Sequence, residues 1–171
     1  MADIERFLAF VRMFTKDKIV HKDDVMMLGR ELYLVPSTLR PLIQKSKRRP
    51  DFAGTLLAAE RGDSFRPSTQ LLDMLQKTDA KRVMVTPEAE WLCVCGRPPL
   101  LTSVIAKSGD PKRGDTVLIE DSEAEVIGYG VVKDEWDKKK GIITLYYDIG
   151  DFLRRERRLM RRPTKQHRYR R

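Results

Sequence analysis

The second half of the chain holds a series of short strand-like stretches separated by turn residues. The predicted strands cover residues 82–86, 100–106, 116–120, 125–132 and 142–147. Short strands punctuated by Gly and Asp turns are typical of a small, mostly antiparallel barrel. One helix interrupts the series, since Pro87 suits a first turn and Gly96 is placed to end it. We therefore predict a compact β-barrel with a short helix after its first strand.

The first 80 residues have a different pattern. Five apolar residues recur at helical spacing near the start of the chain: Ile4, Phe7, Leu8, Val11 and Phe14. A strand is predicted over 31–35, and Ser37 and Ser68 are candidate N-caps for two further helices. The predicted fold class is α+β, with a small mixed α/β domain over 1–80 and a barrel domain over 81–162.

The positive charge of the chain is concentrated at its C-terminal end. The formal net charge is +9, and residues 151–171 contain ten Lys or Arg against two acids, which gives this segment +8. The other 150 residues are nearly balanced, with 24 basic and 23 acidic side chains. A local basic excess of this kind indicates a polyanionic partner, either nucleic acid or an anionic membrane surface.

The basic segment divides at Pro163 into a predicted helix and a tail. Asp148 is a candidate N-cap, and five apolar residues cluster on one helical face: Ile149, Phe152, Leu153, Leu159 and Met160. Arg154, Arg158 and Arg161 centre on the opposite face, which Arg155 flanks. Proline ends the helix because it lacks an N–H, and residues 163–171 are predicted to be a disordered basic tail. We expect the barrel to cover the apolar face, which favours RNA or DNA over a membrane.

Few residues in the chain suggest catalysis or metal binding. Cys93 and Cys95 have no second cysteine pair or nearby histidine to complete a zinc site, and His21 and His167 lie far apart in the sequence. We therefore predict no metal, no cofactor and no enzymatic activity. Trp91, Tyr129 and Trp136 are suited either to the barrel core or to a base-stacking platform, and we predict the core for each. No signal peptide or apolar membrane span is visible, so we expect a soluble intracellular protein.

From Arg82 onward the chain resembles a PUA domain (pseudouridine synthase and archaeosine transglycosylase type). The matching pieces are RVMVTPEAEWLCVCGR, RGDTVLIED and EVIGYGVV. From about Glu31 to Arg157 the chain also resembles the Nip-seven family of large-subunit ribosome-biogenesis factors. That resemblance is carried by the order of LYLVPSTLRPLI, DFAGTLLAAERGDSFRPSTQLLDML, the PUA pieces and YYDIGDFLRRER.

The resemblance implies a pre-PUA α/β domain, a C-terminal PUA barrel, and non-catalytic binding of rRNA precursor in large-subunit assembly. It points to Gly96, Arg97 and Lys107 as RNA-binding residues. It also points to the basic helix face, where we include Arg154, Arg155, Arg158 and Arg161.

The implied partners are RNA, a pre-ribosomal large-subunit particle and other assembly proteins that contact the N-terminal domain of a monomer. Two alternatives stay open, a PUA-containing translation factor and an accessory RNA-binding subunit of a tRNA- or rRNA-modifying enzyme. The compact chain suggests an archaeal, cytoplasmic protein, and a eukaryotic relative would be nucleolar.

Overall fold

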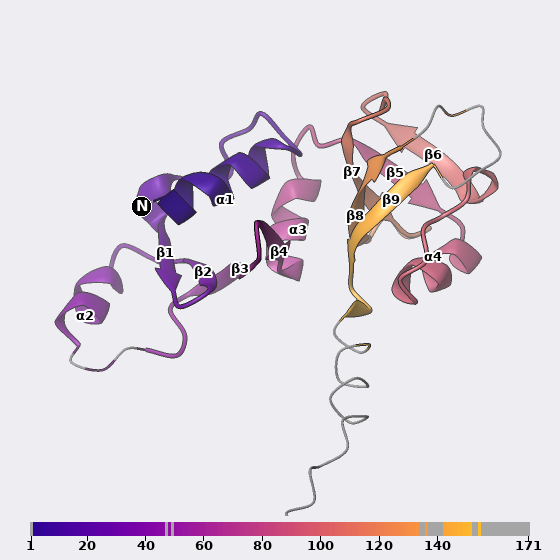
Figure 1. The fold of residues 1–171 in the computed structure, drawn as a ribbon. Helices are drawn as coiled ribbons and strands as arrows, with labels where there is room; N and C mark the ends of the chain where they lie inside the picture. The colour runs from indigo at the N-terminus through magenta and orange to yellow at the C-terminus, as the bar shows by residue number, and fades with distance from the viewer. Residues whose placement is uncertain are drawn as a thin grey trace, which may run out of the picture.

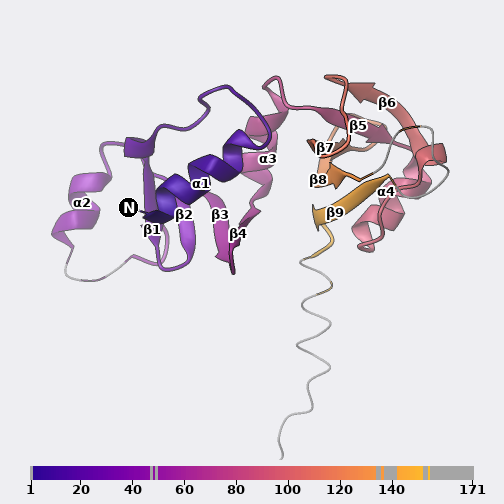
Figure 2. The same ribbon diagram turned by 45° about the horizontal axis from the view of Figure 1, so that its top comes forward.

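The computed structural model describes residues 2–46, 48, 50–133, 136, 142–151 and 154. These residues form two β-sheets that lie side by side, with helix α3 (Thr69–Gln76) between them (Figures 1 and 2). The chain completes the first sheet before it enters α3 and begins the second sheet after it. The α+β prediction is therefore confirmed.

The N-terminal sheet has four antiparallel strands in the order β1-β2-β3-β4. The strands are β1 (Val25–Leu28), β2 (Glu31–Leu34), β3 (Thr55–Arg61) and β4 (Ser64–Pro67). Helices α1 (Ala2–Arg12) and α2 (Arg40–Lys45) and the 3-10 helix η1 (Lys22–Asp24) complete this part. The apolar face of α1 packs into the main core as expected, with Phe7 fully buried. The sequence pattern did not predict β1 or the β3–β4 hairpin.

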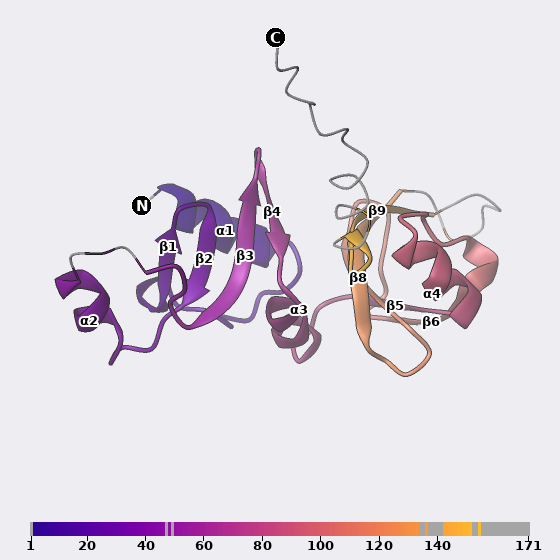
Figure 3. The same cartoon turned by 90° about the horizontal axis from the view of Figure 1, so that it is seen from below.

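The C-terminal sheet has five strands in the order β6-β5-β7-β8-β9. The strands are β5 (Arg82–Val85), β6 (Val104–Ser108), β7 (Thr116–Glu120), β8 (Val126–Val132) and β9 (Ile143–Asp148). The β5–β7 pair is parallel and the other pairs are antiparallel. Helix α4 (Pro87–Val94) lies on the side of this sheet away from the N-terminal part (Figure 3), and the 3-10 helix η2 (Leu101–Ser103) leads into β6.

The five-stranded sheet contributes side chains to two different cores. One core joins Ala89 and Cys93 of α4 to Val83, Val117 and Ile143, among others. The other core belongs mainly to the N-terminal part, but three residues of the second sheet enter it: Leu118, Tyr129 and Tyr147. The two parts of the molecule therefore share this second core, whereas the core under α4 is separate from it.

Several local predictions can be compared directly with the structure. Ser68 caps α3, since its Oγ accepts a hydrogen bond from the Leu71 amide at 3.2 Å. Ser37 does not cap α2, which starts after Leu39 without a side-chain cap. The prediction that Trp91 is a core residue is wrong, because its side chain is 68% exposed on α4. Tyr129 is buried, and Trp136 packs half-buried against the α4 core.

Within the described ranges, no helix has the length and apolar character needed to cross a bilayer. The same residues hold no cluster of three or more potential metal-ligating side chains. Cys93 is buried, and desolvation raises the pKa of its thiol to about 12, so it is neutral at physiological pH. This agrees with its predicted role as a small apolar residue.

Candidate nucleic-acid interface

An ion pair fixes the start of the basic C-terminal segment. Both carboxylate oxygens of Asp148 accept hydrogen bonds from Arg154, at 2.8 Å from Nη1 and 2.7 Å from Nη2. Arg154 Nη1 also donates to the carbonyl of Val94, the last residue of α4. The hydrogen bond to Asp148 raises the pKa of the Arg154 guanidinium. The pair is bidentate and its carboxylate is buried, a geometry that holds both partners in one orientation.

Asp148 has a different role from the one predicted. It is the last residue of β9, and its carboxylate binds Arg154, whereas the sequence analysis placed it at a helix N-cap. Asp151 and Arg154 are helical, and the Arg154 amide donates to the Gly150 carbonyl at 3.1 Å. A β-carbon at Gly150 would clash with the Val94 carbonyl, so glycine is what allows the end of β9 to pass so close to α4.

The C-terminal end of α4 forms the other side of this junction. Gly96 has φ +80°, its amide donates to the Cys93 carbonyl at 2.7 Å, and the Arg97 amide donates to the Leu92 carbonyl at 2.9 Å. These two bonds define a Schellman motif, which needs a left-handed residue at the glycine position. A β-carbon on Gly96 would lie 3.1 Å from Arg154 Cζ, so the guanidinium packs directly against this turn.

Three of the predicted RNA-binding residues lie close together in the structure, and Lys107 lies apart from them. Gly96, Arg97 and Arg154 meet at the α4 turn, and Arg97 is exposed there. Lys107 lies on edge strand β6, with its Nζ 4.4 Å from the centre of the Trp136 ring. Arg155, Arg158 and Arg161 lie outside the described residues.

Arg154 was placed at the centre of an outward basic face, whereas its guanidinium is turned toward Asp148 and the end of α4. The spacing of arginines along a predicted helix could not show this orientation. It depends on Asp148, which is placed by the strand before the helix. We therefore give Arg154 a positioning role, and its contact with RNA stays a prediction.

A second group of residues, which was not predicted from the sequence, lies between the two sheets. A cavity of about 310 Å³ is lined by Arg61, Ser64, Phe65, Arg66, Tyr129, Tyr146 and Tyr147. Arg66 Nε lies 3.4 Å from Asp151, so β4 is tied to the same helical turn that holds Arg154. Burial raises the pKa of Tyr129 to about 12. The only sequence feature that could have indicated this cavity is the Tyr146-Tyr147 pair. It would have done so only together with the β3–β4 hairpin, which was not predicted from the sequence.

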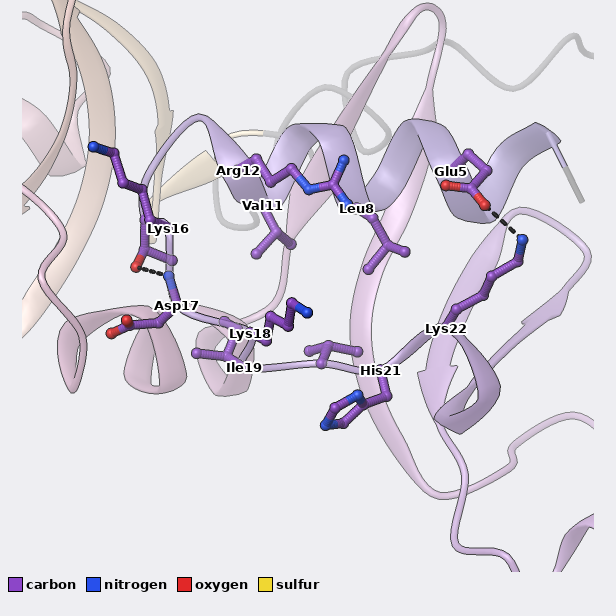
Figure 4. Close-up of a pocket in the computed structure, with 12 residues that line it drawn as sticks. Glu5, Leu8, Val11, Arg12, Lys16, Asp17, Lys18, Ile19, His21 and Lys22 are labelled. Atoms are coloured by element: carbon purple, nitrogen blue, oxygen red, sulfur yellow. Dashed lines mark hydrogen bonds and ion pairs between the residues drawn. The ribbon is translucent and has the colours of Figure 1, made fainter.

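A second hollow, of about 530 Å³, lies between α1 and the segment that leads to β1 (Figure 4). Leu8, Val11 and Ile19 contribute apolar side chains to it, and Lys22 at its edge pairs with Glu5 at 2.5 Å. The hydrogen bond from Lys22 lowers the pKa of the Glu5 carboxyl. This hollow shares no lining residue with the α4 turn. Its lining also includes Arg12, Lys16 and Lys18, so the hollow combines an apolar surface with several basic side chains.

The five-stranded sheet, its α4 helix and the attached C-terminal turn define a PUA-type domain within an α+β protein. Residues 81–157, somewhat less than half of the chain, match the UPF0113 PUA domain family. A PUA domain implies an RNA partner. No protein with a curated description matches the chain in sequence.

Solved archaeal structures share the arrangement over most of its length. A hypothetical protein from Pyrococcus horikoshii superposes with a TM-score of 0.56 at 16% identity, covering 86% of this chain and 90% of that one. A PUA domain protein from Thermoplasma acidophilum gives 0.56 at 14% identity, with 91% and 94% covered. A PUA domain protein from Aeropyrum pernix gives 0.52 at 15% identity, with 88% and 81% covered. At these identities the likeness shows the fold alone.

Proposed function

We propose that this protein is a non-catalytic RNA-binding factor that binds rRNA precursor during assembly of the large ribosomal subunit. The observation that carries the proposal is the junction of Gly96, Asp148 and Arg154. This junction fixes the start of the C-terminal segment, residues 151–171, whose net charge is +8. The exposed Arg97 lies beside it, and both belong to the part of the chain that matches a PUA domain. The order of sequence motifs that resembles the Nip-seven family supports the more specific part, a role in large-subunit assembly.

The mechanism needs only positioned charge and a shaped surface. Arginine side chains form two parallel hydrogen bonds with phosphate oxygens, which gives both affinity and orientation. Gly96 has no side chain, and the Arg154 guanidinium occupies that space, so the glycine serves to position Arg154 beside exposed Arg97. Specificity would come from the shape of folded RNA and from unstacked bases. No bond is made or broken in this proposal.

A pair of charge reversals tests whether the α4 turn is the RNA-binding surface. Arg97 and Arg30 are both exposed, and Arg30 lies in the β1–β2 turn of the other sheet. Arg97→Glu and Arg30→Glu change the net charge equally, so a difference between them reports position. We expect Arg97→Glu to weaken binding of a folded rRNA fragment about tenfold and to reduce the salt slope by about 0.7 to 0.9. Fluorescence anisotropy from 50 to 200 mM salt measures both quantities.

Equal effects of the two reversals would contradict the proposed surface, and an affinity that does not change with salt would contradict the electrostatic mechanism. The assembly role needs a separate experiment. We expect the protein to co-sediment with large-subunit precursors in a gradient. Co-sedimentation with small subunits or polysomes would instead favour a translation factor. A methyl-transfer or tritium-release activity of the purified chain would contradict the non-catalytic part of the proposal.

A further inference from the structure

The strand β9 is irregular at the tyrosine pair that faces the N-terminal part. Tyr129 of β8 pairs with Tyr147, but the next residue, Gly130, pairs with Leu145, so Tyr146 has no partner across the ladder. This is a β-bulge, which re-aims a side chain. In a regular strand, Tyr146 and Tyr147 would point to opposite faces. Here both rings contact Tyr129, with centroids 6.2 Å and 6.3 Å away.

The bulge places an exposed ring on a buried support. Tyr146 is 63% exposed and lies parallel to Tyr129, with 9° between the ring planes. Tyr129 is held edge-on by Phe10 and Phe14, at centroid distances of 5.8 Å and 5.0 Å. Tyr146 is therefore an exposed aromatic surface with a rigid backing. Such a ring is suited to stacking with a nucleic-acid base, whichever base it is.

Positive charge lies beside this ring. Arg61 and Arg66 come from the β3–β4 hairpin and line the same cavity as Tyr146. Arg66 is held in place by Asp151 and by the Tyr147 ring, whose centre lies 5.4 Å from its Cζ. Arg61 is exposed and makes no ion pair with any other described residue. The cavity volume of about 310 Å³ is at the lower end of the range of about 300–1,000 Å³ for small-ligand sites.

We propose that this cavity binds one unstacked nucleotide of the bound RNA, with its base on Tyr146 and its phosphate at Arg61. The inference rests on the proposed RNA-binding function and extends it, because it makes the N-terminal part contribute to the RNA surface. The geometry supports a continuous path. Asp151, which pairs with Arg66, belongs to the same helical turn as Arg154, which packs on Gly96. The cavity and the α4 turn thus flank the start of the basic segment.

The test uses the full chain, a fluorescein-labelled single-stranded uridine-rich RNA and anisotropy at fixed salt. We expect Tyr146→Ala to weaken binding about tenfold, because it removes one base stack. Tyr146→Phe keeps the ring and should stay within about twofold of the wild type. Phe52→Ala is the matched control: Phe52 is 80% exposed but does not line the cavity, so its loss should leave affinity unchanged. Free uridine monophosphate is tested separately as a competitor of the labelled RNA. We expect it to compete poorly, because a single nucleotide cannot also make the contacts at the α4 turn.

A second measurement needs no variant. RNA that carries 4-thiouridine should crosslink to a peptide of β9 that contains Tyr146, as identified by mass spectrometry. If Tyr146→Ala binds like the wild type and the crosslinks lie elsewhere, the nucleotide site is wrong, while weakened binding by Arg97→Glu would still support the proposed function. Tight binding of free uridine monophosphate would overturn the RNA-strand assignment in favour of a mononucleotide site. Failure of the wild type to bind any RNA would overturn the proposed function and this inference together.

Discussion

Two neighbouring residues of β9 enter two very different junctions. Tyr147 joins an aromatic junction between the sheets, which also contains Phe10, Phe14, Phe65 and Tyr129. Asp148, the next residue, joins the charged junction with Arg154 at the end of α4. Apolar burial is large and non-directional, whereas a bidentate pair is smaller in area and strict in geometry. The aromatic junction therefore holds the two sheets together, and the charged junction holds Arg154 against the end of α4.

The largest expected effect comes from breaking the aromatic junction. Tyr129→Ala removes the ring that Phe10 and Phe14 meet edge-on. We expect the free energy of unfolding to fall by about 3–5 kcal/mol, as for other large aromatic truncations in cores. Urea unfolding followed by circular dichroism measures the loss. Tyr129→Phe keeps the ring and should cost less than about 1.5 kcal/mol.

The same experiment tests whether the junction unites the two parts. If the sheets share one core, the wild type should unfold in a single transition. A wild-type protein that unfolds in two well-separated steps, with Tyr129→Ala affecting neither midpoint, would show that the junction is only a contact between independent domains.

A smaller loss is expected at the charged junction. Arg154→Ala leaves the Asp148 carboxylate, whose side chain is 4% exposed, without its bidentate partner. Removing one partner of a fully buried pair costs about 3–5 kcal/mol, and we expect about 2 kcal/mol here because the Arg154 side chain is 31% exposed. Thermal and urea unfolding should agree on this value.

A double substitution separates pairing from packing. In Arg154→Ala with Asp148→Asn the buried charge is absent, so the pair of changes should cost less than the sum of the two single changes. Strict additivity would mean that the guanidinium acts through its contact with Gly96 and Val94, and that the ion pair contributes little.

The sequence predicted the parts of the fold that depend on local patterns. Strand β7 has the predicted bounds, and the Pro87 helix ends at the predicted Gly96 because a left-handed turn requires that residue type locally. The hairpin β3–β4 was not predicted because its strands carry Arg61 and Arg66 on either side of Gly62-Asp63, so that the whole stretch resembles a long turn. Trp91 was misplaced because aromatic character alone does not show which face of a helix is covered.

The candidate site was predictable only in its outline. Charge and periodicity identified the basic segment, and the resemblance to PUA domains indicated Gly96 and Arg97. The partner of Arg154 was hidden, because Asp148 comes from the end of a strand and its orientation depends on the register of β9 with β8. The bulge at Tyr146 was equally hidden, since one extra residue in a strand leaves no mark on an apolar pattern.

The smallest expected effect comes from the Lys81–Asp115 ion pair, which shows how burial changes the contribution of an ion pair to stability. Lys81 Nζ lies 2.6 Å from Asp115, with side-chain exposures of 33% and 32%. Hydrogen bonds from Lys81 and from the Lys112 amide lower the pKa of the Asp115 carboxyl. A carboxyl with a lowered pKa stabilises the folded state above its unfolded pKa of about 3.9, and that contribution is lost as the pH falls through the folded value. We expect Asp115→Asn to cost less than about 1 kcal/mol at pH 7, because solvent screens a half-exposed pair.

The comparison of urea midpoints at pH 7 and pH 3 checks this prediction. The wild type and Asp115→Asn should differ at pH 7, and the difference should shrink as the pH falls below about 3.9 toward the lowered pKa of the folded carboxyl. A loss at pH 7 as large as that of Arg154→Ala would contradict the rule that burial decides the difference. The Lys81–Asp115 contact is as short as those of Arg154, and the two basic side chains are similarly exposed, but the Asp115 side chain is 32% exposed whereas that of Asp148 is 4% exposed. The charged junction at α4 would then owe its strength to distance alone.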